Sequence, residues 1–152
     1  MLQNQAAMFY FAFGSNLDRQ QMKQRCPEST LVARAILPNH AIGFTGYSGR
    51  WGGAVATVVE KRGAETEGLL YEVTDYDLFL LDGYEGHPYA YRRVRKYVRG
   101  PDGRRVRAYV YVRPLSEPDE PSPDYLRVIM RAYMKHGFNM KALKRSVAGA
   151  RS

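Results

Sequence analysis

The sequence contains only one cysteine, Cys26, so no disulfide can form within the chain. No run of about 18 apolar residues is present, and no transmembrane helix is predicted. Residues 1–7 lack the basic start and the apolar core of a signal peptide. No set of cysteine and histidine residues has the spacing of a zinc site, and we expect no bound metal. These absences predict a cytoplasmic protein that does not contact a membrane.

The length of 152 residues suits one domain, with a core at about 8–138 and a basic tail at 139–152. The hydrophobic pattern predicts an α+β fold with a compact, partly closed sheet. Strands are expected at 8–13, 29–37, 40–47, 53–60, 66–73, 89–99 and 104–113, and residues 54–59 are apolar on both faces. Helices are expected to end near residues 25, 82 and 137, and the tail from Lys141 is expected to fray.

The formal net charge is +8, and the excess of basic residues is local. Residues 92–113 contain nine lysines and arginines and one acid, Asp102, with several tyrosines among them. One hypothesis is a module that binds nucleic acid or another polyanion, because basic and aromatic side chains can contact phosphates and bases. The other is a solvated outer face, which charged strands usually form, so we do not expect nucleic acid to bind. An acidic protein is a further partner that this face would suit.

A glycine-containing turn, Phe13-Gly14-Ser15-Asn16-Leu17, follows the first predicted strand. Such a turn directs backbone N–H groups toward one point, where the dipole of the following helix also favours negative charge. The turn is therefore a candidate site for a carboxylate or a developing oxyanion. The alternative is a turn that only caps the helix. Ser15 is not expected to be a nucleophile, because the sequence lacks GxSxG and no histidine lies nearby.

Glu85 is a candidate acid/base because it lies between Gly83 and Gly86, directly after a predicted helix. Flanking glycines allow the backbone to bend so that a carboxylate points into a cavity. The alternative is a solvated surface glutamate, the common state of this residue type. Asp82 is expected to be a helix-end residue or a hydrogen-bond partner.

Two tyrosines, Tyr91 and Tyr125, are further candidates. A tyrosine hydroxyl can bind a polar ligand while the ring packs into the wall, and plain core packing is the alternative for each. The three histidines, His40, His87 and His136, lie far apart in the sequence. We expect them to be structural or surface residues and not ligands.

Taken together, FYFAFGSNL at 9–17, LLDGYEGHPYAYRR at 80–93 and PSPDY at 121–125 resemble the γ-glutamylcyclotransferase family in their order and spacing. The likeness runs from about residue 9 to about residue 138. It implies a small mixed β-barrel flanked by short helices, with substrate between the GSN loop and a catalytic glutamate. The resemblance places that glutamate at Glu85 and the substrate-binding residues at Phe13, Gly14, Ser15, Asn16, Leu17, Tyr91 and Tyr125.

The resemblance also implies a reaction. The α-amine of a γ-glutamyl amide would attack the γ-carbonyl, with Glu85 as general acid/base, and release 5-oxoproline and a free amine or amino acid. No metal or organic cofactor is expected. Phe13 departs from the family, which commonly has YGSN, so the hydroxyl of that tyrosine is missing here. The leaving amine, the group held by the loop and the oligomeric state stay open, and the alternatives are the polyanion-binding module and an inactive relative.

Overall fold

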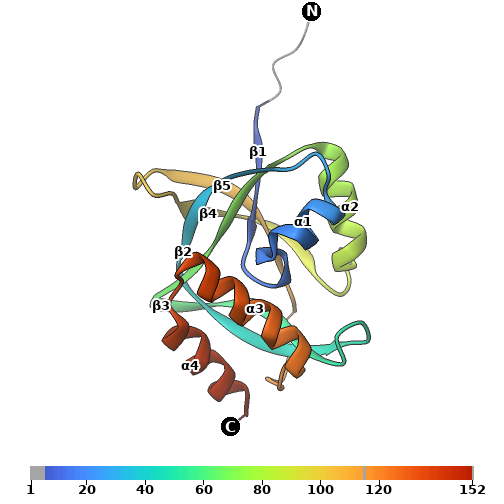
Figure 1. Ribbon diagram of the computed structural model, residues 1–152, viewed down its shortest axis with the longest axis vertical. Coiled ribbons are helices and arrows are strands. Elements are labelled where there is room, and N and C mark those ends of the chain that lie inside the picture. Colours follow the sequence, from blue (N-terminus) through green and yellow to red (C-terminus); the bar gives the residue numbers. More distant parts are fainter. Residues whose placement is uncertain (1–5, 115, 152) are drawn as a thin grey trace, which may run out of the picture.

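The computed structural model describes residues 6–114 and 116–151 of the chain. Within them, five strands form a closed barrel and helices lie around it (Figure 1). The strands are β1 (Met8–Ala12), β2 (Thr30–Ser48), β3 (Gly53–Val73), β4 (Arg92–Arg99) and β5 (Arg105–Val112). The helices are the short 3₁₀ helix η1 (Ser15–Leu17), α1 (Arg19–Arg25), α2 (Asp75–Glu85), α3 (Pro123–His136) and α4 (Met140–Arg151). The predicted α+β fold with a small barrel is confirmed.

The barrel is mixed because its closing pair differs from the others. Its strand order is β1-β3-β2-β4-β5, and neighbouring strands in that order are antiparallel. β1 then pairs in parallel with β5 through Tyr10 and Tyr109, which closes the sheet. This closure places β1, near the start of the chain, beside the β4–β5 hairpin. Segments remote in sequence therefore meet at one end of the barrel.

β2 and β3 are two long strands, and the prediction of four shorter ones was wrong. Both strands continue through the positions near Pro38 and Gly63 where the sequence predicted them to end, and together they form one long hairpin. The register shifts between Pro38 and His40, and Asn39 has a φ of 58°. The Asn39 side chain accepts a hydrogen bond from the Gly63 N–H at 3.0 Å. Such a bulge bends a strand without ending it.

The core fills the barrel and extends under the helices. Ala54, Val55, Ala56, Thr57 and Val58 are all buried, which confirms that this segment is covered on both faces. The two strands predicted at 89–99 and 104–113 are also present, and they pair as an antiparallel hairpin around a turn at 100–103.

The C-terminal residues form α4, so the prediction that the tail frays was wrong. Leu143, Val147 and Ala150 are buried, and the helix packs on β2 and α3. Figure 1 shows α3 and α4 next to each other against the barrel. The apolar stripe of this helix is narrow, and the many basic residues around it make the helical spacing difficult to recognise in the sequence. Among the described helices, none is long and apolar enough to cross a membrane.

Candidate active site

A cavity of about 340 Å³ opens at the end of the barrel where β1, α2 and β5 all finish. This volume is at the small end of ligand pockets, which span about 300–1,000 Å³. Seven of the eight predicted site residues line it: Phe13, Gly14, Ser15, Asn16, Glu85, Tyr91 and Tyr125. Leu17 does not, because its side chain is buried in the core. The closed barrel thus brings together residues from three separate segments.

Side chains of α1 and β1 form hydrogen bonds with the GSN loop. Gln21 donates through Nε2 to Ser15 Oγ at 2.8 Å and to Asn16 Oδ1 at 2.9 Å. Asn16 is buried and donates through Nδ2 to the hydroxyl of Tyr10 at 3.0 Å. Asp18 caps α1 through the N–H of Gln20 and that of Gln21. Gln21 of α1 and Tyr10 of β1 therefore hold the side chains of the loop in place.

The backbone of the loop approaches the cavity closely. The Leu17 N–H donates to the Gly14 carbonyl at 3.0 Å and is not free for a ligand. Among the described residues, no acceptor pairs with the backbone N–H of Ser15 or with that of Asn16. A Cβ at Gly14 would lie 3.2 Å from the Tyr125 hydroxyl, so a side chain there would crowd the site. Glycine lets the loop and this hydroxyl come together.

Glu85 is the last residue of α2, and the prediction that this helix ends at Asp82 was wrong. A capping box of Thr74 and Asp77 starts the helix. Gly83 lies inside the helix, and Gly86 ends it with a φ of 67°. The end of the helix, and not a bend between two glycines, therefore carries Glu85 to the cavity.

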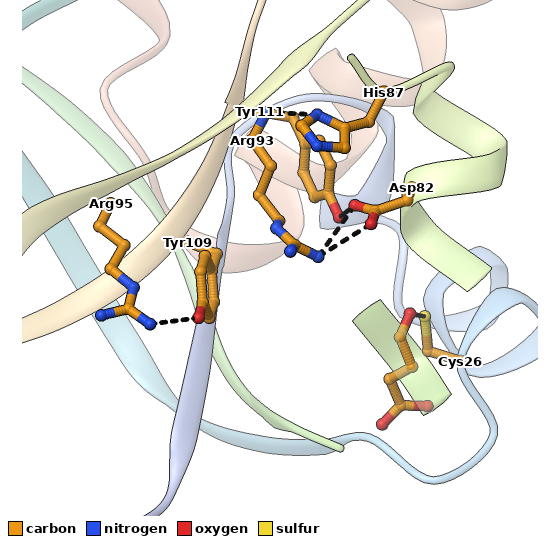
Figure 2. Close-up of polar contacts among 8 residues, drawn as sticks. Cys26, Asp82, His87, Arg93, Arg95, Tyr109 and Tyr111 are labelled. Atoms are coloured by element: carbon orange, nitrogen blue, oxygen red, sulfur yellow. Dashed lines mark hydrogen bonds and ion pairs between the residues drawn. The ribbon is translucent and has the colours of Figure 1, made fainter. Parts of the chain in front are cut away.

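Asp82 anchors this end of α2 to the hairpin, as Figure 2 shows. Arg93 donates through Nη1 to both carboxylate oxygens at 3.1 and 2.9 Å. The Tyr111 hydroxyl donates to Asp82 Oδ1 at 2.7 Å. The Arg93 N–H also donates to His87 Nδ1 at 3.0 Å, on the segment that follows the helix. Asp82 is thus the hydrogen-bond partner that the sequence suggested, and it fixes Glu85 one turn away.

We expect Asp82→Ala to lower the free energy of unfolding by about 2 kcal/mol, because hydrogen bonds to charged groups contribute about that much. The change also leaves the buried Tyr111 hydroxyl without an acceptor. Chemical denaturation of the purified variant measures the effect. Arg127→Ala removes an exposed ion pair with Asp124 and should change the stability by less than about 0.5 kcal/mol. Equal effects of the two variants would contradict the role given to Asp82.

Glu85 has an altered pKa because it is enclosed by protein. Burial raises the pKa of its carboxyl from the usual 4.5 to about 7, although the positive charges of Arg25 and Arg113 oppose this shift. The same burial raises the pKa of both Tyr91 and Tyr125, which stay protonated at neutral pH. A carboxyl that titrates near neutrality can both accept and return a proton.

Tyr91 and Tyr125 are anchored on the same residue of β3. The Tyr91 hydroxyl donates to the Ala56 carbonyl at 2.7 Å, and the Tyr125 hydroxyl accepts from the Ala56 N–H at 2.9 Å. Tyr125 therefore keeps its own hydroxyl proton for another acceptor. Trp51, on the turn between β2 and β3, packs edge-on against Tyr125 with ring centroids 5.1 Å apart.

Several cavity residues escaped the sequence analysis. Tyr10, Arg25, Trp51, Tyr111 and Arg113 all line the cavity. Tyr10 lies within the FYFAFGSNL segment but was not among the candidate site residues, and the other four belong to no motif. Tyr111 is buried, although it belongs to the basic and aromatic segment at 92–113. The pairing of β1 with β5 brings Tyr10 and Tyr111 together, with ring centroids 5.8 Å apart. Arg25 of α1 and Trp51 of the β2–β3 turn reach the same cavity only through the tertiary fold.

Two other kinds of chemistry find no support at this site. In the part of the chain that the structure describes, no three His, Cys, Asp or Glu residues gather closely enough to hold a metal ion. Cys26 is buried, and burial raises the pKa of its thiol to about 12. A thiol that stays protonated is a poor nucleophile.

The model of the gamma-glutamyl cyclotransferase, AIG2-like family matches residues 10–127. This chain belongs to that family. A Bos taurus gamma-glutamylcyclotransferase is 27% identical over 148 residues, which cover 94% of this chain and 79% of the relative. The Mus musculus protein of that name is 28% identical over 133 residues, covering 84% and 71%. A solved gamma-glutamyl cyclotransferase structure superposes with a TM-score of 0.84 at 24% identity, covering 93% of this chain and 86% of the other, and confirms the fold.

The basic face of the cyclotransferase barrel lies on the β4–β5 hairpin, outside the cavity. Arg93 and Arg99 on this face form ion pairs with Asp82 and Glu65. Arg95 lies over the Tyr109 ring at 4.9 Å, and Arg105 lies over the Tyr97 ring at 4.2 Å. The chain's own arginines therefore cover the tyrosine rings on which bases would stack. These contacts favour the hypothesis of a solvated outer face.

Proposed function

We propose that this chain is a γ-glutamylcyclotransferase that cleaves a γ-glutamyl amide and releases 5-oxoproline with a free amine or amino acid. The observation that carries the proposal is Glu85, whose carboxyl pKa is about 7 in a cavity that faces the GSN loop. Membership of the family supports the reaction type. Glu85 is the general acid/base of the proposed mechanism.

The mechanism moves protons between two nitrogens of the substrate. The α-ammonium gives one proton to the Glu85 carboxylate, and the resulting amine attacks the γ-carbonyl carbon. Glu85 then gives this proton to the departing nitrogen as its bond to the γ-carbon breaks. The ionised carboxylate accepts the second proton that the α-nitrogen loses on becoming the lactam N–H, and passes it to the released amine. No water is consumed.

Hydrogen-bond donors around the cavity would hold the substrate in this arrangement. The N–H groups of Ser15 and Asn16, and the hydroxyl of Tyr125, are available for the α-carboxylate or for the oxyanion. Phe13 lines the cavity without a hydroxyl, so the proposal assigns the loop a backbone role. Because the ring closes within one molecule, holding the glutamyl chain folded supplies a large part of the acceleration.

The rate should depend on pH through Glu85. We expect kcat/KM to rise about tenfold per pH unit in acid, because the reaction needs the ionised carboxylate. The rise should level off near pH 7, where the burial-raised pKa of Glu85 lies. Initial rates across the pH range, with pH-insensitive product detection, provide the measurement. Levelling off near 4.5, the usual pKa of a glutamate, would show that Glu85 is not the titrating group.

The proposed function is tested by incubating the purified protein with a panel of γ-glutamyl amino acids and γ-glutamyl amines. Mass spectrometry quantifies 5-oxoproline and the released amine. The proposal predicts equal amounts of both products from at least one member. Absence of 5-oxoproline from the whole panel would contradict it and favour the inactive relative or the polyanion-binding module.

A further inference from the structure

The cavity contains more positive charge than the glutamyl group requires. Arg25, Arg50 and Arg113 line it, and Glu85 is the one acidic residue among its described lining residues. Within residues 6–114 and 116–151, the ion pairs join other arginines to carboxylates at 2.6–3.8 Å. None of these pairs involves Arg25, Arg50 or Arg113. Three arginines facing a single carboxylate, Glu85, leave an excess of positive charge in the cavity, which favours an anionic ligand.

Arg25 belongs to the glutamyl side of the cavity. It is buried at the end of α1 and donates through Nη1 to Asn16 Oδ1 at 3.2 Å, directly beneath the GSN loop. Its Nε is buried and has no hydrogen-bond partner within the described part of the chain. One arginine next to the loop suffices for the single α-carboxylate of a γ-glutamyl group. Two arginines remain for the rest of the substrate.

Arg113 lines the cavity directly after β5 and is held in place by its neighbours. Its N–H donates to Thr57 Oγ1 at 2.9 Å, and its guanidinium lies over the Tyr91 ring at 5.1 Å. A Cβ at Gly46 would lie 2.5 Å from Nη2 of Arg113, and Gly46 has a φ of +68°. Glycine at this position thus permits both the backbone turn and the close approach of the guanidinium. A fixed guanidinium is suited to bind a carboxylate.

Arg50 lies at the rim on the exposed turn between β2 and β3. Its guanidinium is 6.0 Å from the centre of the Trp51 ring, which itself packs against Tyr125. Burial lowers the pKa of Arg25, and the nearby positive charge of Arg50 lowers it further. Arg50 therefore extends the positive wall from the loop to the cavity entrance.

We propose that Arg113 and Arg50 form a second anion subsite that binds carboxylates of the leaving group. This inference rests on the proposed function and names its substrate class, γ-glutamyl amino acids in which the departing amino acid is dicarboxylic. The γ-glutamyl group brings one carboxylate, and a dicarboxylic leaving group brings two more to face the two remaining arginines. A leaving group with a free ammonium, such as a polyamine, would be repelled by the same wall.

The test uses three γ-glutamyl compounds of nearly equal shape, whose leaving groups are aspartate, asparagine and asparagine amide. They carry two, one and no carboxylates. We expect kcat/KM for 5-oxoproline release to rise by about tenfold with each carboxylate, as for hydrogen bonds between charged groups. In Arg113→Gln, the ratio between the aspartate and asparagine amide compounds should fall by about tenfold or more.

Two further variants keep the result interpretable. Arg50→Gln changes an exposed side chain and should also reduce the ratio if Arg113→Gln fails to fold. Arg107→Gln removes an exposed arginine of β5 outside the cavity and should leave the ratio unchanged. Equal kcat/KM for all three compounds, or a preference that survives in Arg113→Gln and Arg50→Gln, would overturn the subsite and leave the cyclotransferase function intact. Absence of release from all three, with release from other members of the γ-glutamyl panel, would overturn the subsite alone. Absence of release from the whole panel would overturn the proposed function and the subsite with it.

Discussion

Glu85→Gln is expected to lower the rate of 5-oxoproline release by about 10²- to 10⁴-fold, the usual contribution of a general acid/base. The amide has nearly the same size as the carboxyl but cannot accept a proton from the α-ammonium. Because Glu85 also protonates the departing nitrogen, both halves of the reaction lose their catalyst. Single-turnover rates of 5-oxoproline formation, measured with saturating substrate, separate this loss from any change in binding.

Two variants serve as comparisons for Glu85→Gln. Glu28→Gln changes a solvent-exposed glutamate outside the cavity and should not alter the rate. Glu85→Asp keeps the carboxyl but withdraws it by one methylene, so an intermediate rate is expected. Equal rates for Glu85→Gln and the unchanged protein would remove Glu85 from the mechanism, although the membership of the family would stand.

Glu85→Gln is also expected to make the protein more stable in weakly alkaline solution. Burial raises the pKa of the Glu85 carboxyl in the folded protein to about 7, against the usual 4.5. Ionising this group above pH 7 therefore opposes folding, by up to about 3 kcal/mol for a shift of this size. Glutamine has no charge to desolvate, so Glu85→Gln should gain about 2–3 kcal/mol at about pH 8.

The sign of this effect is opposite to that of a salt-bridged carboxylate. Below pH 4.5 the group is protonated in both the folded and unfolded states, and the two proteins should be equally stable. The difference should grow as pH rises from there to about 7 and then stay constant. Urea denaturation at several pH values measures it. A Glu85→Gln variant that is less stable at every pH would show that the carboxylate is stabilised by its arginine neighbours instead of penalised by burial.

The sequence was sufficient for the parts of the site that depend on short local motifs. The GSN loop begins where β1 ends, and Glu85 follows a capping box at a fixed distance along one helix. Such features keep their geometry wherever the rest of the chain lies. The family resemblance then supplied the arrangement of the two segments around a cavity.

The helix boundary at Glu85 could not be predicted in the same way. A glycine inside a helix costs about 1 kcal/mol, which made Gly83 a reasonable place to end α2. The contacts of Asp82 with Arg93 and Tyr111, from strands far along the chain, outweigh this local preference. Tertiary contacts of this kind leave no local signal in the sequence.

The arginines of the cavity were hidden for a different reason. Arg113 follows the β4–β5 hairpin, which has several exposed arginines, and nothing in the local pattern separates it from them. Its role depends on Gly46 and Tyr91, which the barrel places beside it. The sequence pattern does not distinguish an arginine on a surface strand from an arginine in a cavity, because the difference depends on how the barrel closes.

In the proposed mechanism the α-amine of the substrate, and not water, attacks the γ-carbonyl, with Glu85 as proton carrier. The direct test is to run the reaction in water labelled with heavy oxygen, using the unchanged protein and Glu85→Gln, and to analyse the products by mass spectrometry. We expect unlabelled 5-oxoproline in equal amount to the released amine, with both products lost in Glu85→Gln. Labelled glutamate in place of 5-oxoproline would show hydrolysis by water and would rule out attack by the α-amine.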